Sequence, residues 1–177
     1  MTVGASPLHG ANALFLWSRT NTPLAGPPVA RVWQHGQEPL TVTLGYSPTL
    51  GYFIGRVELD PERPMVGTVA VAARSTGGDT ARMSSQFVVY PVDAESREYL
   101  TSIDGRVRLA LPAGVVSQNS ALSIMASAYL QRPPGLVPLS YPYHIGISPA
   151  SPELSGTGVL TFYLDEHRMS RVVPGSA

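Results

Sequence analysis

The chain has 177 residues, of which 44% are hydrophobic and 14% charged, and its 12 Lys+Arg and 12 Asp+Glu residues leave no net formal charge. This balance gives no broad electrostatic attraction to nucleic acid or to an anionic membrane, and we expect neither as a partner. The chain contains no Lys and no Cys. Schiff-base and P-loop lysine chemistry, thiolate catalysis, disulfides and Cys-ligated zinc are therefore excluded.

Turn-forming residues are abundant, with 17 Gly and 17 Pro, and apolar residues recur with a period near two. This combination favours many short strands over long helices. No stretch approaches the ~20 apolar residues of a membrane span. The N-terminus lacks the basic region of a signal peptide, and its apolar run Ala13–Trp17 is too short for one. The segment is then either cytosolic or an internal part of a longer exported chain.

The first half of the chain contains several expected strands. "NALFLW" (12–17) and "VARVW" (29–33) are strand-like, with a loop between them. "PLTVTLGYS" (39–47) alternates as one half-buried strand; its expected inner face is Leu40, Val42, Leu44 and Tyr46. In "GYFIGRVELDP" (51–61) the alternation places Phe53, Val57 and Leu59 on one face, and Gly55 predicts a bulge or a close approach.

A hairpin and a linker are expected next. The β-rich runs 66–74 and 85–92 are separated by a Gly-Gly turn, which predicts a hairpin. "DAESREYL" (93–100) has Asp93 as a candidate N-cap for one or two helical turns. We interpret residues 93–99 as a linker between two modules, 1–92 and 100–177.

The second half resumes the strand pattern. "RVRLAL" (106–111) alternates, with Val107, Leu109 and Leu111 inward, and "ALSIMASAYL" (121–130) alternates after it. "SYPYHIGIS" (140–148) lies in a Pro-rich region and is expected as an edge strand, and "GTGVLTFYLDE" (156–166) is the last strong strand. The chain is therefore predicted to be all-β, with about ten short, mostly antiparallel strands forming two sandwiches.

The segment Leu100–Glu166 resembles a bacterial relative of the ZU domain, a β-sandwich named after zonula-occludens proteins and Unc-type netrin receptors. The residues that carry the likeness are "TSIDGRVRLALPAGVVSQNSALSIMAS" and "PLSYPYHIGISPASPELSGTGVLTFYLDE". The preceding part, about residues 40 to 92, looks like an immunoglobulin-like or fibronectin-like module. Such pairs imply accessory segments of large exported bacterial surface proteins or secreted hydrolases.

Catalytic signatures are weak in this sequence. No Gly-x-Ser-x-Gly elbow occurs, because Pro149 in "GISPA" stands where the turn into a helix is needed. The four His residues are far apart: His9, His35, His144 and His167. We therefore assign no catalytic residue and no cofactor, and we expect no enzyme activity. A Ser/His/Asp triad assembled from distant positions stays open as an alternative.

Acidic residues occur mainly beside turns. The candidates for calcium ligands are Asp60, Glu62, Asp79, Asp104, Asp165 and Glu166, with His167 next to the last two. No EF-hand or Gly-Asp repeat is present, and turn acids that bond their own backbone explain these residues better. We assign no metal site.

Aromatic residues offer an alternative, glycan-binding interpretation. Sugar rings stack on exposed aromatic side chains, and the candidates are Trp17, Trp33, Tyr141 and Tyr143, with Tyr46 and Tyr52 as further aromatics. The competing interpretation is that several of them are core residues. Unpaired edge strands offer a second mode, in which the chain pairs with other protein domains or neighbouring copies. In one form of this hypothesis the two N-terminal apolar runs add to a neighbour.

These observations predict a non-enzymatic structural or interaction module of an exported or cell-surface bacterial protein. It would act as a spacer, display or assembly unit, located outside the cell. The alternative is a carbohydrate-binding accessory module of a secreted hydrolase.

Overall fold

The computed structural model describes residues 1–8, 12–126, 143–148 and 155–164. The predicted all-β class is confirmed, because these residues form thirteen strands and no helix. The strands are β1 (Thr2–Leu8), β2 (Ala13–Arg19), β3 (Val29–Gln34), β4 (Leu40–Thr43), β5 (Gly45–Ser47), β6 (Tyr52–Glu58), β7 (Val66–Arg74), β8 (Thr80–Val92), β9 (Glu98–Thr101), β10 (Val107–Leu111), β11 (Ser120–Ala126), β12 (Tyr143–Ser148) and β13 (Val159–Phe162).

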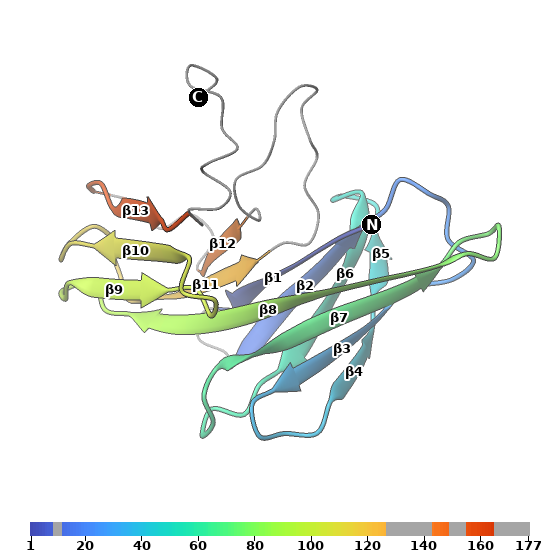
Figure 1. The fold of residues 1–177 in the computed structure, drawn as a ribbon, viewed down its shortest axis with the longest axis horizontal. Helices are drawn as coiled ribbons and strands as arrows, with labels where there is room; N and C mark the ends of the chain where they lie inside the picture. The colour runs from blue at the N-terminus through green and yellow to red at the C-terminus, as the bar shows by residue number, and fades with distance from the viewer. Residues whose placement is uncertain (9–11, 127–142, 149–154, 165–177) are drawn as a thin grey trace, which may run out of the picture.

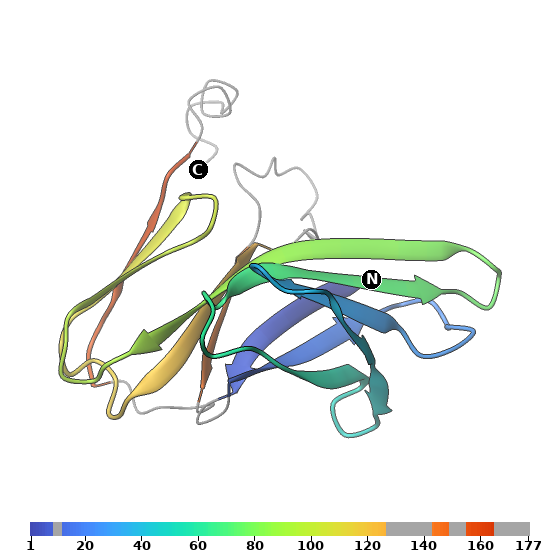
Figure 2. The same ribbon diagram turned by 90° about the horizontal axis from the view of Figure 1, so that it is seen from below.

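The strands form three antiparallel sheets (Figure 1). A four-stranded sheet has the order β1-β2-β6-β5, a six-stranded sheet the order β12-β11-β8-β7-β3-β4, and a three-stranded sheet the order β13-β10-β9. Figure 2 shows the three-stranded sheet standing over one end of the six-stranded sheet. In the described part of the chain, no helix is long and apolar enough to cross a membrane.

The long strand β8 connects the two ends of the six-stranded sheet. Its first part pairs with β7, from Arg74↔Thr80 to Val66↔Val88. Its last part pairs with β11, from Met125↔Phe87 to Ser120↔Val92. One continuous strand therefore supports both ends of the molecule.

The first hydrophobic core lies between the four-stranded sheet and one face of the six-stranded sheet. Apolar residues that alternate along the facing strands are fully buried there; they include Leu14, Leu16, Val32, Val69, Phe87 and Met125. These residues reach the same core because residues two apart on a strand face the same side.

The second hydrophobic core lies on the opposite face of β11, beneath the three-stranded sheet. Leu122 and Ile124 of β11 face this core, whereas their neighbour Met125 faces the first. Leu100 of β9 and Leu111 of β10 pack against them. Both faces of β11 are thus buried, and large apolar residues stand on both of them, Leu122 and Ile124 on one face and Met125 on the other.

The expected single strand over residues 39–47 is divided between two sheets. β4 pairs with β3 in the six-stranded sheet, and β5 pairs with β6 in the four-stranded sheet. Leu44 lies between them, fully buried, and its N–H donates to the carbonyl of Pro28 (2.9 Å). The predicted shared inner face is therefore wrong for Leu40 and Tyr46, which are exposed.

Two predictions in the first half are confirmed. Runs 66–74 and 85–92 form a hairpin, in which β8 starts earlier than expected, at Thr80. Gly55 makes a close approach, since a Cβ there would lie 2.6 Å from Leu44 Cδ2. The alternative of a bulge at Gly55 is wrong, because β2 and β6 pair without interruption.

The N-terminal runs are strands of the chain's own sheets. The runs 12–17 and 29–33 form β2 and β3 as predicted, and β1 precedes them. β2 pairs with β1 and β6, and β3 pairs with β7 and β4. Both edges of β2 and of β3 are therefore occupied within the chain, whereas β1 is the terminal strand of its sheet, and addition of the N-terminal segment to a neighbouring molecule stays a prediction.

The segment between the two halves is a turn followed by a strand. Ser96 N–H bonds the carbonyl of Asp93 (3.3 Å), and β9 begins at Glu98 within the expected linker. The expected helical turns are not formed. In the second half, β12 is the terminal strand of its sheet, as an edge strand should be, and residues 127–130 of the run 121–130 lie outside the described residues.

Candidate functional site

The open face of the six-stranded sheet carries an aromatic and basic surface. On β3, Ala30 and Val32 are fully buried, so the alternating residues Val29, Arg31 and Trp33 point outward. The outward residues of β3, β7 and β8 define what we call the Trp33 face: Val29, Arg31, Trp33, Thr68, Ala70, Ala72, Arg82, Ser84 and Gln86.

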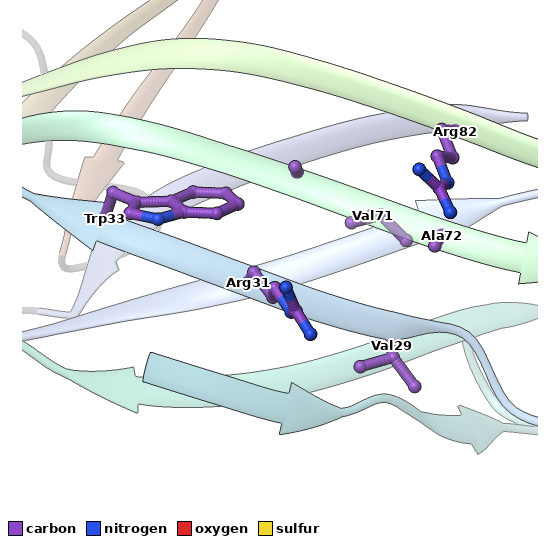
Figure 3. A pocket seen from close by; sticks show the side chains of 7 residues that line it. Val29, Arg31, Trp33, Val71, Ala72 and Arg82 are labelled. Carbon is purple, nitrogen blue, oxygen red and sulfur yellow. The ribbon is translucent and has the colours of Figure 1, made fainter. Parts of the chain in front are cut away.

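Strand register orders these residues in rows across the sheet. One row runs Val29–Ala72–Arg82, and the next places Arg31 beside Ala70. Figure 3 shows Val29, Arg31 and Trp33 along β3 and Arg82 on β8, with β7 between them. The small Ala side chains on the middle strand leave a hollow of about 350 Å³ between the larger side chains. This volume lies in the range of small-ligand sites, ~300–1,000 Å³.

The two Arg side chains of this hollow have no acidic partner among the described residues. The described residues form the ion pairs Arg56–Glu58 (2.6 Å) and Arg63–Asp60 (3.2 Å), and neither pair lies in the hollow. The Trp33 face itself contains no Asp or Glu. Its charge is therefore positive although the whole chain is neutral.

A second polar group surrounds Asp104 at the β9–β10 turn. Oδ1 of Asp104 accepts hydrogen bonds from Ser102 Oγ (2.6 Å) and from the backbone N–H of Arg106 (3.2 Å). Oδ2 accepts a hydrogen bond from the hydroxyl of Tyr143 on β12. Asp104 thus connects the three-stranded sheet to the six-stranded sheet.

Hydrogen bonding controls the charge of this group. Partial burial acts to raise the pKa of Asp104, but the hydrogen bonds from Ser102, Tyr143 and the Arg106 backbone, with the Arg106 charge, outweigh it, so the pKa is lowered. Burial and the Asp104 carboxylate raise the pKa of Tyr143. The carboxylate is therefore ionised and the phenol neutral at ordinary pH, an arrangement suited to holding two sheets together.

A third group places a Ser and a His together between β1 and β12. Ser6 Oγ lies 3.2 Å from His144 Nε2, and the His144 ring stands edge-on to Trp17 with the ring centroids 5.7 Å apart. Burial lowers the pKa of His144. Among the described residues no carboxylate contributes to this shift, whereas a His that activates a Ser nucleophile is normally oriented by a third group.

Two of the described acidic candidates, Asp60 and Asp104, accept hydrogen bonds from the backbone of their own turns, whereas Glu62 and Asp79 take part in turns through main-chain atoms. Asp60 Oδ1 accepts from the Glu62 N–H (3.0 Å), and Asp104 does the same for Arg106, as predicted. Within the described residues no three His, Asp or Glu side chains gather to hold a metal. Asp165, Glu166, His9 and His167 lie outside the described residues.

The four aromatic residues singled out in the sequence do not form one strip. Trp17 is half-buried on β2 beside Tyr52 and His144, and Trp33 lies on the open face of another sheet, 36% exposed. Tyr143 packs edge-on to Phe162 (centroids 6.3 Å apart) and bonds Asp104. Tyr141 lies outside the described residues.

Sequence reasoning missed the two Arg residues of the Trp33 face. Arg31 shares a face with Trp33 by simple alternation in "VARVW", which was a usable signal. Arg82 reaches the same hollow only through the β7–β8 register, in which it opposes Ala72. That register depends on where the hairpin turn closes, and the expected strand started too late to include Arg82.

The outer strand of the three-stranded sheet is an exposed apolar edge. β13 pairs with β10 on one side, and no described strand pairs with its other side. All four of its residues are exposed, with Val159 at 63%, Leu160 at 43% and Phe162 at 47%. None of the four carries a charge.

Comparison with known proteins identifies no relative. No family model matches the chain, and neither a curated protein nor a solved structure matches it.

Proposed function

We propose that the chain is a non-enzymatic interaction module that assembles through an edge strand. The observation that carries the proposal is β13, an uncharged and apolar strand whose outer edge has no described partner. Soluble proteins usually protect such edges with charges or Pro, because the free backbone groups pair with another strand. A second copy of the chain, or another domain with a free strand, satisfies these groups.

The cellular setting and the finer fold belong to the same proposal. An exported or cell-surface bacterial protein is what the resemblance of Leu100–Glu166 to a ZU-like domain implies. We further propose an immunoglobulin-like module over residues 1–92 and a ZU-like module over 100–177, an identity that rests on the sequence resemblance. The two separate cores support only a division into two packing units. The strands β8 and β11 contribute to both cores, so the modules in this proposal share a sheet.

Sedimentation velocity tests the assembly directly. We expect the wild-type chain to associate as its concentration rises, and the variant Val159→Lys to stay monomeric. Val159 is exposed and pairs with Ala110, on the face of the sheet away from the second core, so the added charge acts at the edge and meets no like charge across the strand pair. The matched control is Gln86→Lys, an exposed position on the interior strand β8.

The outcomes separate clearly. Association that is lost in the β13 variant and kept in Gln86→Lys supports the proposal. A strictly monomeric wild-type chain at high concentration contradicts self-assembly. Association that survives both substitutions shows that another surface is responsible.

Carbohydrate binding is the second candidate function. The observation that favours it is the hollow beside Trp33, because an exposed indole presents a flat apolar surface to the C–H face of a sugar ring. The open sheet face leaves room for an extended chain to lie across the strands.

A further inference from the structure

We propose that the hollow of the Trp33 face binds an acidic saccharide, a sugar chain that carries carboxylates, such as a polymer of uronic acids. This inference rests on the second candidate function, carbohydrate binding, and names its ligand class. It is independent of strand pairing at β13, which lies in a different sheet.

The aromatic part of the hollow selects a ring. Trp33 is 36% exposed, and Thr68 lies opposite it on β7, with Ala70 along the same strand toward Arg82. The short side chain of Ala70 leaves space next to the indole, in which a pyranose ring buries its apolar face. A longer side chain at position 70 would fill this space.

The basic part of the hollow selects a carboxylate. Arg31 lies two residues from Trp33 on β3, and Arg82 lies across β7 on β8, so the two strands are on the order of 10 Å apart. Neither Arg forms an ion pair or a side-chain hydrogen bond with any described residue. Both guanidinium groups are available to bind carboxylates in the bidentate geometry that Arg favours.

Charge complementarity decides between acidic and neutral sugars. A neutral sugar offers the two guanidinium groups only hydroxyl acceptors, whereas a uronic acid chain supplies one carboxylate per sugar ring. The wall residues Val29, Ala72 and Ala70 are apolar, so the polar recognition falls to Arg31 and Arg82. The pairing of indole and guanidinium groups fits a sugar better than an acidic peptide, because a peptide of Asp or Glu offers no flat ring for Trp33.

Isothermal titration with three polymers tests the proposal. The probes are polygalacturonate, its fully methyl-esterified form, in which the same sugars carry no charge, and polyglutamate. We expect the chain to bind polygalacturonate. It should bind the methyl ester about tenfold more weakly, because charge-assisted hydrogen bonds are lost. Binding should also weaken as salt is raised.

Variants of the chain locate the binding site. Trp33→Ala and the double variant Arg31→Gln/Arg82→Gln should each weaken polygalacturonate binding about tenfold. Ala70→Leu should weaken it without changing any charge, because it fills the hollow. The control is Arg19→Gln, which removes one positive charge from an exposed position on β2 and should leave binding unchanged. Thermal melting of each variant checks that the chain is folded.

Each remaining outcome contradicts the inference. Equal binding of the methyl ester shows a neutral-sugar site, and equal binding of polyglutamate with no effect of Trp33→Ala shows a basic surface for acidic proteins. Absence of binding to every polymer removes the acidic-saccharide site. None of these results affects the sedimentation test of assembly through β13. The assembly proposal and the acidic-saccharide proposal therefore fail separately.

Discussion

Asp104 shows how a residue that looked like a simple turn former acquires a role in joining sheets. The sequence "DGRVRLALPAG" predicts the turn correctly, and Gly105 has the positive φ (69°) that such a turn requires. The sequence gives no sign that the Asp104 carboxylate also accepts a hydrogen bond from Tyr143, which is 39 residues later. Contacts over such separations depend on sheet topology, which local patterns do not encode.

The hydrogen bond between Tyr143 and Asp104 leads to a prediction about pH. Because the pKa of Asp104 is lowered in the folded state, the unfolded state binds more protons as the pH falls. The stabilisation is therefore present above the unfolded pKa, about 3.8, and is lost as the pH falls through the lower folded value. Tyr143→Phe should reduce the free energy of unfolding by about 1 kcal/mol at pH 7.

Urea denaturation of wild type and Tyr143→Phe, measured between pH 7 and pH 2.5, checks this. The difference between the two proteins should shrink at the acid end, where Asp104 becomes protonated. A difference that stays constant with pH would mean that the phenol acts by packing against Phe162 (ring centroids 6.3 Å apart).

At the scale of elements, most strands could be predicted, including β11, which has two buried faces, and β13, which has none. β2, β3, β6, β7 and β10 alternate and were expected. The sequence does not predict β1. Gly4 and Pro7 interrupt this segment, most of its residues are buried, and no clear alternation marks it as a strand. β4 and β5 were expected as one strand, because the change of sheet at Leu44 leaves the alternation intact.

Close approach between strands gives a prediction about Gly67. A Cβ at this position would lie 2.0 Å from the carbonyl oxygen of Trp33 and 2.9 Å from Phe87 Cζ. Because the first of these is a backbone atom, β3 and β7 must separate. We expect Gly67→Ala to lower the free energy of unfolding by about 1–3 kcal/mol.

Gly45 provides the matched control for this substitution. It also lies in a strand, β5, but a Cβ there meets no atom within 4 Å. Gly45→Ala should change the free energy of unfolding by no more than about 0.5 kcal/mol. Equal urea midpoints for the two variants would show that β3 and β7 accommodate the methyl group without strain.

At the scale of the whole molecule, the arrangement of β8 and β11 determines how the two cores are coupled. The sequence-based division into modules 1–92 and 100–177 predicts two units that unfold separately. The structure places Phe87 of β8 in the first core and Val92 of the same strand in the second. Unfolding the second core removes β11, which pairs with the last part of β8 and contributes Met125 to the first core. This coupling favours a single cooperative transition.

Tryptophan fluorescence can follow this coupling, because Trp17 and Trp33 both lie in strands of the first core, β2 and β3. Leu100→Ala removes a buried side chain from β9 in the second core and should cost about 2–5 kcal/mol. We expect the fluorescence transition in urea to move to lower concentration together with the far-ultraviolet circular dichroism. A fluorescence midpoint equal to that of wild type, with circular dichroism that becomes biphasic, would show that the shared sheet does not couple the cores and that two modules fold independently.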